Sequence, residues 1–187
     1  MTFPNFYIMG VDPGSHTLGV CLMEMSPSLE IVSIVTYSPI ISVSDSVGLY
    51  DNIIARLKKL EFMIRSIYSI YKPAIVAMES SFINGARLGA VIPLTKSISL
   101  VETVLTSIDE HIKLVSIPPP VIKKVFKAKQ KGKDTVKEAL LNKKTLNSHL
   151  DIEKMSEHSI DAVAIAYTLL EFLKANKGML CIRYLQR

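Results

Sequence analysis

Residues 6–25 read FYIMGVDPGSHTLGVCLMEM, and this stretch decides the fold. Two apolar runs, residues 6–11 and 18–25, flank the segment Asp12-Pro13-Gly14-Ser15, whose residue types are typical of a turn. A third run, residues 29–37, is rich in β-branched side chains and follows after a few polar residues. Short connections between runs of this kind favour antiparallel pairing. The sequence therefore predicts three antiparallel strands at the start of the chain.

Beyond these strands, the spacing of apolar residues changes to three and four. This period predicts a helix over residues 47–71, and the unbroken apolar run at residues 74–78 predicts a buried strand. A second helix is predicted over residues 88–108, where Pro93 is expected to delay the start or kink the helix. A fifth strand is predicted over residues 112–117. This order of elements predicts a mixed α/β protein, with a central sheet and helices on both faces.

The last third of the chain is predicted to be mainly helical. We expect a short helix over residues 119–126, then a lysine-rich loop, and then a helix from Asp134 to about residue 144. Residues 147–155 are predicted to form a polar connection. Ser156 is predicted to begin the last strong helix, because a serine directly before an apolar periodic segment is a common N-cap.

Length and composition exclude several classes of protein. The 187 residues predict one domain over residues 1–187, with no structure assigned to the tail at 174–187. No apolar run approaches the roughly 18 residues of a membrane span, and the first residues do not resemble a signal peptide. Two cysteines are too few for a disulfide framework, and the common glycine-rich nucleotide-binding loops are absent. We therefore expect a cytoplasmic protein without a membrane partner or a nucleotide cofactor.

The net charge of +5 comes mostly from one short segment. Six lysines lie close together in it: Lys123, Lys124, Lys127, Lys129, Lys131 and Lys133. Without them, 16 basic residues stand against 17 acidic residues, so the rest of the chain is nearly neutral. Such a local cluster predicts a surface that binds nucleic-acid phosphates. A solvated loop without any partner would have the same composition.

Three acidic residues occur in or next to apolar segments. Asp12 follows the first predicted strand, Glu79 follows the fourth, and Asp161 lies inside the last helix. Acids at such places are costly unless they are paired, hydrogen-bonded or bound to a metal ion. If the first and fourth strands are parallel neighbours, Asp12 and Glu79 leave the sheet at the same end. His158 precedes Asp161 by one helical turn, so the two side chains share a helix face.

These four side chains together suggest a metal site. Three carboxylates and an imidazole make a donor set that suits Mg²⁺ or Mn²⁺ better than Zn²⁺. Taken singly, each has a plainer interpretation: Asp12 as a turn residue, Glu79 as a solvated strand end, and Asp161 as the partner of a surface lysine. The joint placement of the three acids is what favours a catalytic site.

Three segments of the sequence resemble the RuvC family of Holliday junction resolvases. They are residues 10–15 (GVDPGS), residues 77–79 (AME) with Phe82 three residues later, and residues 158–166 (HSIDAVAIA). The match is in register from about residue 6 to residue 173. The resemblance implies an RNase H-like fold with a mixed five-stranded sheet whose first three strands are antiparallel. It further implies a homodimer that cuts four-way DNA junctions in recombination and repair.

The resemblance also assigns roles to single residues. The family's four catalytic, metal-binding positions fall on Asp12, Glu79, His158 and Asp161. Two Mg²⁺ or Mn²⁺ ions are implied in each active site, and many members carry Asp where this chain has His158. Phe82 falls on the aromatic position that meets bases at the junction centre. Lys123 and Lys133 fall on two basic positions that face the scissile region, and the lysines between them are expected to bind DNA as well.

Departures from the family pattern leave other interpretations open. The segment at residues 123–133 is richer in lysine than is usual, residues 84–95 match poorly, and the tail has no counterpart. These features suit a bacteriophage-type member, which would act in the bacterial or infected-host cytoplasm and could cut other branched DNA. The alternatives are another RNase H-like nuclease acting on flaps or RNA–DNA hybrids, and a non-catalytic junction-binding protein. The apolar face of residues 88–108 is a candidate dimer interface or, equally, part of the core.

Overall fold

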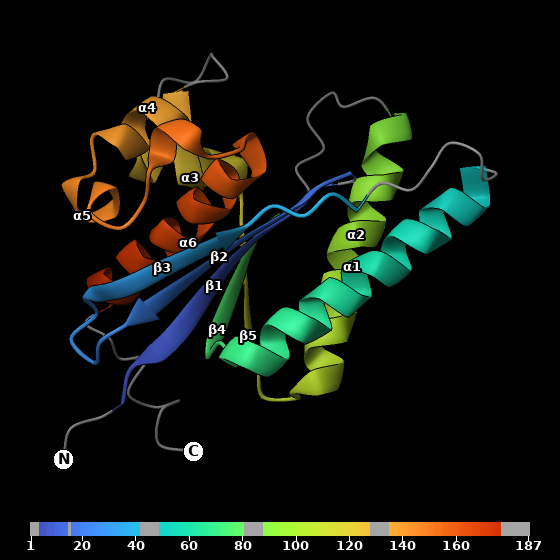
Figure 1. Ribbon diagram of the computed structural model, residues 1–187, viewed down its shortest axis with the longest axis horizontal. Coiled ribbons are helices and arrows are strands. Elements are labelled where there is room, and N and C mark those ends of the chain that lie inside the picture. The colour runs from blue at the N-terminus through green and yellow to red at the C-terminus, as the bar shows by residue number, and fades with distance from the viewer. Residues whose placement is uncertain (1–3, 15, 42–48, 81–87, 128–134, 177–187) are drawn as a thin grey trace.

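A five-stranded sheet forms the centre of the computed structural model, which describes residues 4–14, 16–41, 49–80, 88–127 and 135–176 (Figure 1). Its strands are β1 (Phe6–Pro13), β2 (Leu18–Met25), β3 (Ile31–Tyr37), β4 (Ile75–Glu79) and β5 (Lys113–Ile117). The strand order is β3-β2-β1-β4-β5, with antiparallel pairing among β1, β2 and β3. β4 runs parallel to both β1 and β5. The predicted mixed sheet is therefore confirmed.

Helices cover both faces of this sheet, as the sequence predicts. One face carries α1 (Leu49–Tyr71) and α2 (Leu88–Ile108), which pack against each other. The other face carries α6 (Glu157–Ala175) together with the shorter helices α3 (Pro119–Val125), α4 (Thr135–Leu141), α5 (Lys144–Asn147) and η1 (Ile152–Lys154) (Figure 1). Among the described residues, no helix combines the length and the apolar character needed to cross a membrane.

Two apolar cores result from the alternation of side chains along the strands. Ile8 and Met23 belong to the core beneath α6, whereas Met9 and Leu22 belong to the core beneath α1 and α2. All four side chains are fully buried. Because β1 and β2 are covered on both faces, their sequences are nearly continuous apolar runs rather than alternating ones.

The α6 helix approaches the sheet closely at two strand glycines. A Cβ atom on Gly10 would lie 2.6 Å from the backbone nitrogen of Ala166. A Cβ atom on Gly19 would collide with the carbonyl oxygen of His158 and lie 2.8 Å from its carbonyl carbon. Gly19 is also the partner of Asp12 across the β1–β2 ladder. The missing side chains therefore let the helix backbone lie directly on the strand pair that carries Asp12.

The start of β3 and the effect of Pro93 on α2 need comment. β3 begins at Ile31 rather than at residue 29, because Leu29 adopts a φ of 63° in the turn between β2 and β3. α2 spans Leu88–Ile108, as predicted, and contains Pro93, so of the two expected effects of this proline the delayed start does not occur. The hydroxyl of Ser97 donates to the carbonyl of Pro93 over 3.1 Å, within this continuous helix.

The segment between α4 and α6 is more ordered than the sequence predicts. The helix expected to run to about residue 144 ends at Leu141, and a separate short helix, α5, follows it. The polar connection predicted for residues 147–155 contains η1, whose Ile152 is buried in the core beneath α6. Because Ile152 is surrounded in the sequence by polar residues, the sequence does not indicate that its side chain is buried.

Candidate active site

Asp12 and Glu79 leave the sheet at the same end. Asp12 is the second-last residue of β1 and Glu79 is the last residue of β4, and these two strands are parallel neighbours. The N–H group of Gly14 donates to the Asp12 carbonyl over 2.9 Å, which starts a tight turn directly after the carboxylate. The turn holds Asp12 at a fixed strand end.

The first turns of α6 bring the other two predicted side chains to the same edge. Ser156 caps this helix, and its hydroxyl oxygen accepts from the N–H group of Ser159 over 3.2 Å. The helix thus begins just before His158 and places Asp161 one turn further along. The Nδ1 atom of His158 lies 2.7 Å from the Oδ2 atom of Asp12.

This contact assigns a role to each ring nitrogen of His158. An ionised carboxylate can only accept hydrogen bonds, so Nδ1 of His158 donates to Asp12. A neutral imidazole in this tautomer keeps the lone pair of Nε2 for a metal ion or for water. The side chain of His158 is 38% exposed, whereas that of Asp12 is only 13% exposed. The imidazole therefore links a largely buried carboxylate to solvent.

Glu79 and Asp161 line one cavity next to this edge. Lys123 from α3, Val136 from α4 and Ile165 from α6 are also part of its wall. The ammonium group of Lys123 lowers the pKa of Glu79, an effect smaller than the increase that burial causes. The cavity thus combines two carboxylates and one cation in a partly apolar setting.

All three carboxyl groups have a raised pKa. Burial, followed by the charges of Asp12 and Asp161, raises the pKa of Glu79 to about 7. Burial, followed by the charges of Asp12 and Glu157, raises the pKa of Asp161 to about 6. Burial also raises the pKa of Asp12, although its hydrogen bond to His158 opposes the change. Burial in a setting of low polarity and the repulsion between the acids therefore both disfavour the ionised forms of these groups.

This donor set fits a hard divalent cation. Carboxylate oxygens with one imidazole suit Mg²⁺ and Mn²⁺, and a cation would offset the repulsion that raises these pKa values. Within the described ranges, no three His, Cys, Asp or Glu side chains lie close enough together to hold one ion as they stand. Asp12 is instead hydrogen-bonded to His158. The four residues therefore lie near one another, but their donor atoms are not arranged to coordinate one metal ion.

Two contributions to the site are not predicted from the sequence. Glu157, the first residue of α6, helps to raise the pKa of both Asp12 and Asp161. An acid in the first turn of a helix is usually explained by its favourable interaction with the helix dipole. Its effect on the pKa of nearby acids is therefore not evident from the sequence. The close approach of α6 at Gly10 and Gly19 is also missed. Glycines inside two apolar strands, opposite a helix with alternating alanines, are the signal for it.

The predicted DNA-binding residues are only partly described. Lys123 lines the cavity with Glu79 and Asp161, and Lys124 and Lys127 are exposed at the end of α3 and just beyond it. The remaining predicted contacts fall outside the described residues: Phe82, Lys129, Lys131 and Lys133.

Sheet order and carboxylate placement together define the class of protein. A mixed sheet in the order β3-β2-β1-β4-β5, with acids on β1, β4 and the last helix, is the arrangement of the RNase H-like fold. Within that class, the chain belongs to the RuvC family. The family model described as crossover junction endodeoxyribonuclease RuvC matches residues 8–169, which is most of the chain.

Solved structures agree with this fold. RuvC of Thermus thermophilus, in complex with a Holliday junction substrate, has a TM-score of 0.70 at 15% identity, covering 91% of this chain and 96% of that one. Another structure of Thermus thermophilus RuvC gives 0.68 at 15% identity, with coverages of 92% and 97%. The yeast mitochondrial Holliday junction resolvase Ydc2 gives 0.61 at 10% identity, with coverages of 96% and 83%. No curated protein matches the sequence.

Proposed function

We propose that this protein is a metal-dependent endonuclease that resolves four-way DNA junctions. The observation that carries the proposal is the gathering of Asp12, Glu79, His158 and Asp161 at one edge of an RNase H-like sheet. Membership of the RuvC family supports the reaction class. The relative from Thermus thermophilus that holds a Holliday junction supports the choice of branched DNA as substrate.

The carboxylates would hold the metal ions. Asp12, Glu79 and Asp161 are the residues that would bind two Mg²⁺ or Mn²⁺ ions, with Asp12 as the candidate bridging ligand. When bound, two such cations stabilise the attacking and the leaving oxygen of a phosphodiester. Asp12 suits the shared position because the turn after it limits its movement, whereas Glu79 and Asp161 approach from different elements.

His158 and Lys123 would position the reactants. With Nδ1 donating to Asp12, the Nε2 atom of His158 can orient the attacking water or accept its proton. The ammonium group of Lys123 shares a cavity with Glu79 and Asp161, so it can hold the scissile phosphate beside the carboxylates. In this proposal both side chains act on the water and the DNA rather than on the fold.

The DNA arms would be bound outside the carboxylate cluster. Phe82 would stack on an unpaired base at the open centre of the junction, and the lysines of residues 123–133 would contact phosphates. A four-way junction has two symmetry-related cleavage positions, so a homodimer would match it. Val101, Val104 and Leu105 of α2 are buried against the sheet, so a dimer interface on α2 would use its other sides.

A cleavage assay on a panel of substrates tests this proposal. The panel contains a four-way junction, a flap, an RNA–DNA hybrid and a linear duplex, each labelled on one strand at a time. With Mg²⁺ we expect paired, symmetric nicks in the junction, and no cleavage with a chelator. Asp12→Asn, Glu79→Gln and Asp161→Asn should lower cleavage by about 1000-fold or more and still bind the junction.

The controls separate the competing functions. His158→Asp should remain active, because many family members carry Asp at this position. Preferred cleavage of the flap or the hybrid would favour another RNase H-like activity. Junction binding without cleavage by the unmodified protein would indicate a non-catalytic binding protein. Full activity of Asp12→Asn would remove Asp12 from the active site.

A further inference from the structure

Lys123 lies on a helix that is too short to be stable without contacts to the rest of the fold. This helix, α3, has seven residues and begins with two prolines. Isolated helices shorter than about 12 residues are marginal in water. Pro118, the residue before α3, has no side chain that could cap the helix. Packing must therefore fix where α3 lies and where it presents Lys123.

Two buried side chains on one side of α3 provide that packing. Ile122 and Phe126 both belong to the core beneath α6. They are four residues apart, so their side chains lie on the same face of the helix. The N–H group of Phe126 donates to the carbonyl of Ile122 over 3.2 Å, which extends the helical hydrogen bonding to Phe126. Because Lys123 directly follows Ile122, the contacts that hold these two side chains also hold Lys123.

The backbone leaves the helical conformation directly after Phe126. Lys127 has a φ of 51°, in the left-handed region that residues other than glycine rarely adopt. Its N–H group donates to the carbonyl of Lys124 over 3.1 Å. A strained backbone conformation of this kind persists only where surrounding contacts determine it. The buried ring of Phe126, one residue earlier, supplies such a contact.

The ring of Phe126 packs on an aromatic ring of α6. Its centroid lies 5.5 Å from the centroid of the Tyr167 ring, and the two ring planes are inclined by 42°. Aromatic pairs at such distances attract each other beyond the effect of burial alone. Tyr167 is itself buried, and it belongs to the same helix as Asp161. The aromatic pair therefore connects α3 with the helix that carries one of the active-site carboxylates.

A cation lies over both rings. The ammonium nitrogen of Lys143, between α4 and α5, is 5.1 Å from the ring centroid of Tyr167 and 5.8 Å from that of Phe126. Both distances are within the range of about 6 Å in which a cation is attracted to the face of an aromatic ring. The contact joins α3, α6 and the connection between α4 and α5, which all lie on one face of the sheet (Figure 1).

The same short helix reaches the active site. Ile122 and Lys123 both line the cavity that contains Glu79 and Asp161. Glu79 is held by the central sheet and Asp161 by the long helix α6, whereas Lys123 is carried by seven residues. A shift of α3 would therefore move the ammonium group away from two carboxylates that stay in place. Misplacement of a reacting or positioning group by about 1 Å can lower a rate by about 100-fold.

We propose that Phe126 is a positioning residue, which holds Lys123 opposite Glu79 and Asp161, and that Tyr167 and Lys143 fix its ring. This inference rests on the proposed function, in which Lys123 holds the scissile phosphate. Phe126 is buried, so it acts on the reaction only through the position of Lys123.

A double-mutant cycle on the cleavage rate tests this role. Single-turnover cleavage of a four-way junction is measured with Mg²⁺ and enough protein to bind all the DNA. Lys123→Ala should slow cleavage about 100-fold, as expected for a group that stabilises charge in the transition state. Phe126→Leu should slow it about tenfold, because α3 shifts. In the Lys123→Ala protein, adding Phe126→Leu should slow it less than about twofold, since no ammonium group remains to be misplaced.

Phe6→Leu provides the matched control. Phe6 is a buried residue of the same apolar core, but it lies at the start of β1. Its replacement makes the same change of side chain and should lower the melting temperature by a similar amount. Cleavage should be unchanged, both with and without Lys123. All rates are measured at a temperature at which the melting curves show every variant to be folded.

Variants of Lys143 test the same contact without changing the core. Lys143→Met removes the charge and keeps a long side chain, so cleavage should slow about threefold. Lys143→Arg keeps a cation over the rings and should retain the rate of the parent. If Phe126→Leu does not fold, the cycle with Lys123→Ala is made with Lys143→Met instead.

Three outcomes would overturn the inference, and one of them would also overturn the proposed function. Equal slowing by Phe126→Leu with and without Lys123 would mean that Phe126 does not act through Lys123. Full cleavage by Lys123→Ala would remove Lys123 from the active site and leave Phe126 nothing to position. A parent protein that binds the junction but does not cleave it would overturn the proposed function as well.

Discussion

The two faces of the sheet are both covered by helices, but they are packed in different ways. On the α6 face, Gly10 and Gly19 let helix backbone rest on strand backbone. On the other face, side chains such as Met9 and Leu60 fill the space between the layers. Packing on the α6 face therefore fixes the distance between helix backbone and strand backbone. On the α1–α2 face, side chains fill the space between the layers, so the distance between backbones is less strictly fixed. The side chains that need fixed distances, Asp12 and His158, meet on the first of these faces.

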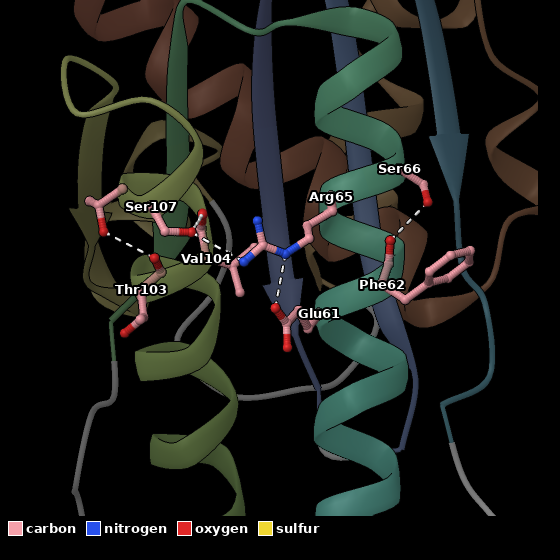
Figure 2. Close-up of polar contacts among 8 residues, drawn as sticks. Glu61, Phe62, Arg65, Ser66, Thr103, Val104 and Ser107 are labelled. Carbon is pink, nitrogen blue, oxygen red and sulfur yellow. Dashed lines mark hydrogen bonds and ion pairs between the residues drawn. The ribbon is translucent and has the colours of Figure 1, made fainter.

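The seam between α1 and α2 illustrates the looser arrangement. Arg65 connects the two helices by donating to Ser107, yet its stronger partner is Glu61 on its own helix (Figure 2). The hydroxyl of Thr103 likewise donates to a carbonyl of its own helix, that of Ser99, over 2.8 Å. Polar groups on this face are satisfied mostly within one helix, so small movements between α1 and α2 disrupt little.

The largest effect on stability is expected for Gly19→Ala. The new Cβ would collide with the carbonyl oxygen of His158 and lie 3.2 Å from the Cβ of Asp12, so α6 must move. We expect a loss of about 3 kcal/mol in the free energy of unfolding, measured with denaturant, because the atoms in the way belong to the backbone. Metal-dependent cleavage should also fall, because the contact between His158 and Asp12 is displaced.

Val104→Ile is the matched control on the other face. It also adds one carbon atom at a buried position, but its neighbours are side chains that can change rotamer. Its cost should be clearly smaller than that of Gly19→Ala, and cleavage should be unchanged. An equal loss in the free energy of unfolding for the two variants would show that both faces tolerate an added carbon atom equally well.

The second-largest effect is expected for Glu79→Gln, which should stabilise the protein in the absence of divalent metal. The pKa of Glu79 is raised from 4.5 to about 7, so the folded state binds this proton more tightly than the unfolded chain does. The stability of the parent therefore falls as the pH rises from 4.5 to 7 and stays lower above 7. Glutamine does not ionise, so the variant does not lose stability in this way. At pH 8 its free energy of unfolding should exceed that of the parent by about 2 kcal/mol after allowance for solvent screening.

Denaturant unfolding at pH 8 and at pH 4 measures this gain. The variant should be more stable than the parent at pH 8 and equally stable at pH 4, where Glu79 is protonated in both states. Added Mg²⁺ should stabilise the parent more than the variant. Equal stability at pH 8 would mean that Glu79 ionises without cost and that the edge carries no excess of negative charge.

A smaller effect is expected for Tyr68→Phe on α1. The hydroxyl of Tyr68 donates to Oδ2 of Asp109 over 2.7 Å, and this bond is the main cause of the lowered pKa of Asp109. Its loss should cost about 1 kcal/mol in thermal unfolding, because Asp109 can turn to water instead. Cleavage of the junction should be unaffected. A loss of activity in a stable Tyr68→Phe variant would show that the α1–α2 face does influence the active site.

The smallest effect is expected for Arg65→Ala. Its ion pair with Glu61 is between exposed side chains, and such pairs contribute little. We expect a change in the free energy of unfolding of under about 0.5 kcal/mol, seen by denaturant titration. A larger loss would mean that the contact with Ser107 helps to hold α1 and α2 together.

The order of strands and helices could be predicted from the sequence because the spacing of apolar residues indicates the type of every long element. Asp12, Glu79 and Asp161 could be singled out because acids are costly in apolar segments. Ile152 could not be recognised as a core residue, since a single buried side chain in a polar stretch produces no periodic signal. The turn at Leu29 could not be located either, because its positive φ occurs in a residue that rarely adopts one.

The details of the site depended on distances that the sequence does not contain. The helical spacing of His158 and Asp161 indicates a shared face, but it does not say that His158 is hydrogen-bonded to Asp12. That bond accompanies the close approach of α6 to β2 at Gly19, where a Cβ atom would meet the backbone of His158. The roles assigned to all these side chains stay predictions. Phe82 and the lysines beyond Lys127 also lie outside the described ranges.

The proposed function requires that the carboxylates at the ends of β1 and β4 bind divalent metal. Anomalous X-ray scattering from crystals of the unmodified protein soaked in Mn²⁺ tests it most directly. We predict Mn²⁺ peaks coordinated by Asp12, Glu79 and Asp161, with two ions about 4 Å apart. Crystals that bind Mn²⁺ at other positions, and none at these three carboxylates, would contradict the claim.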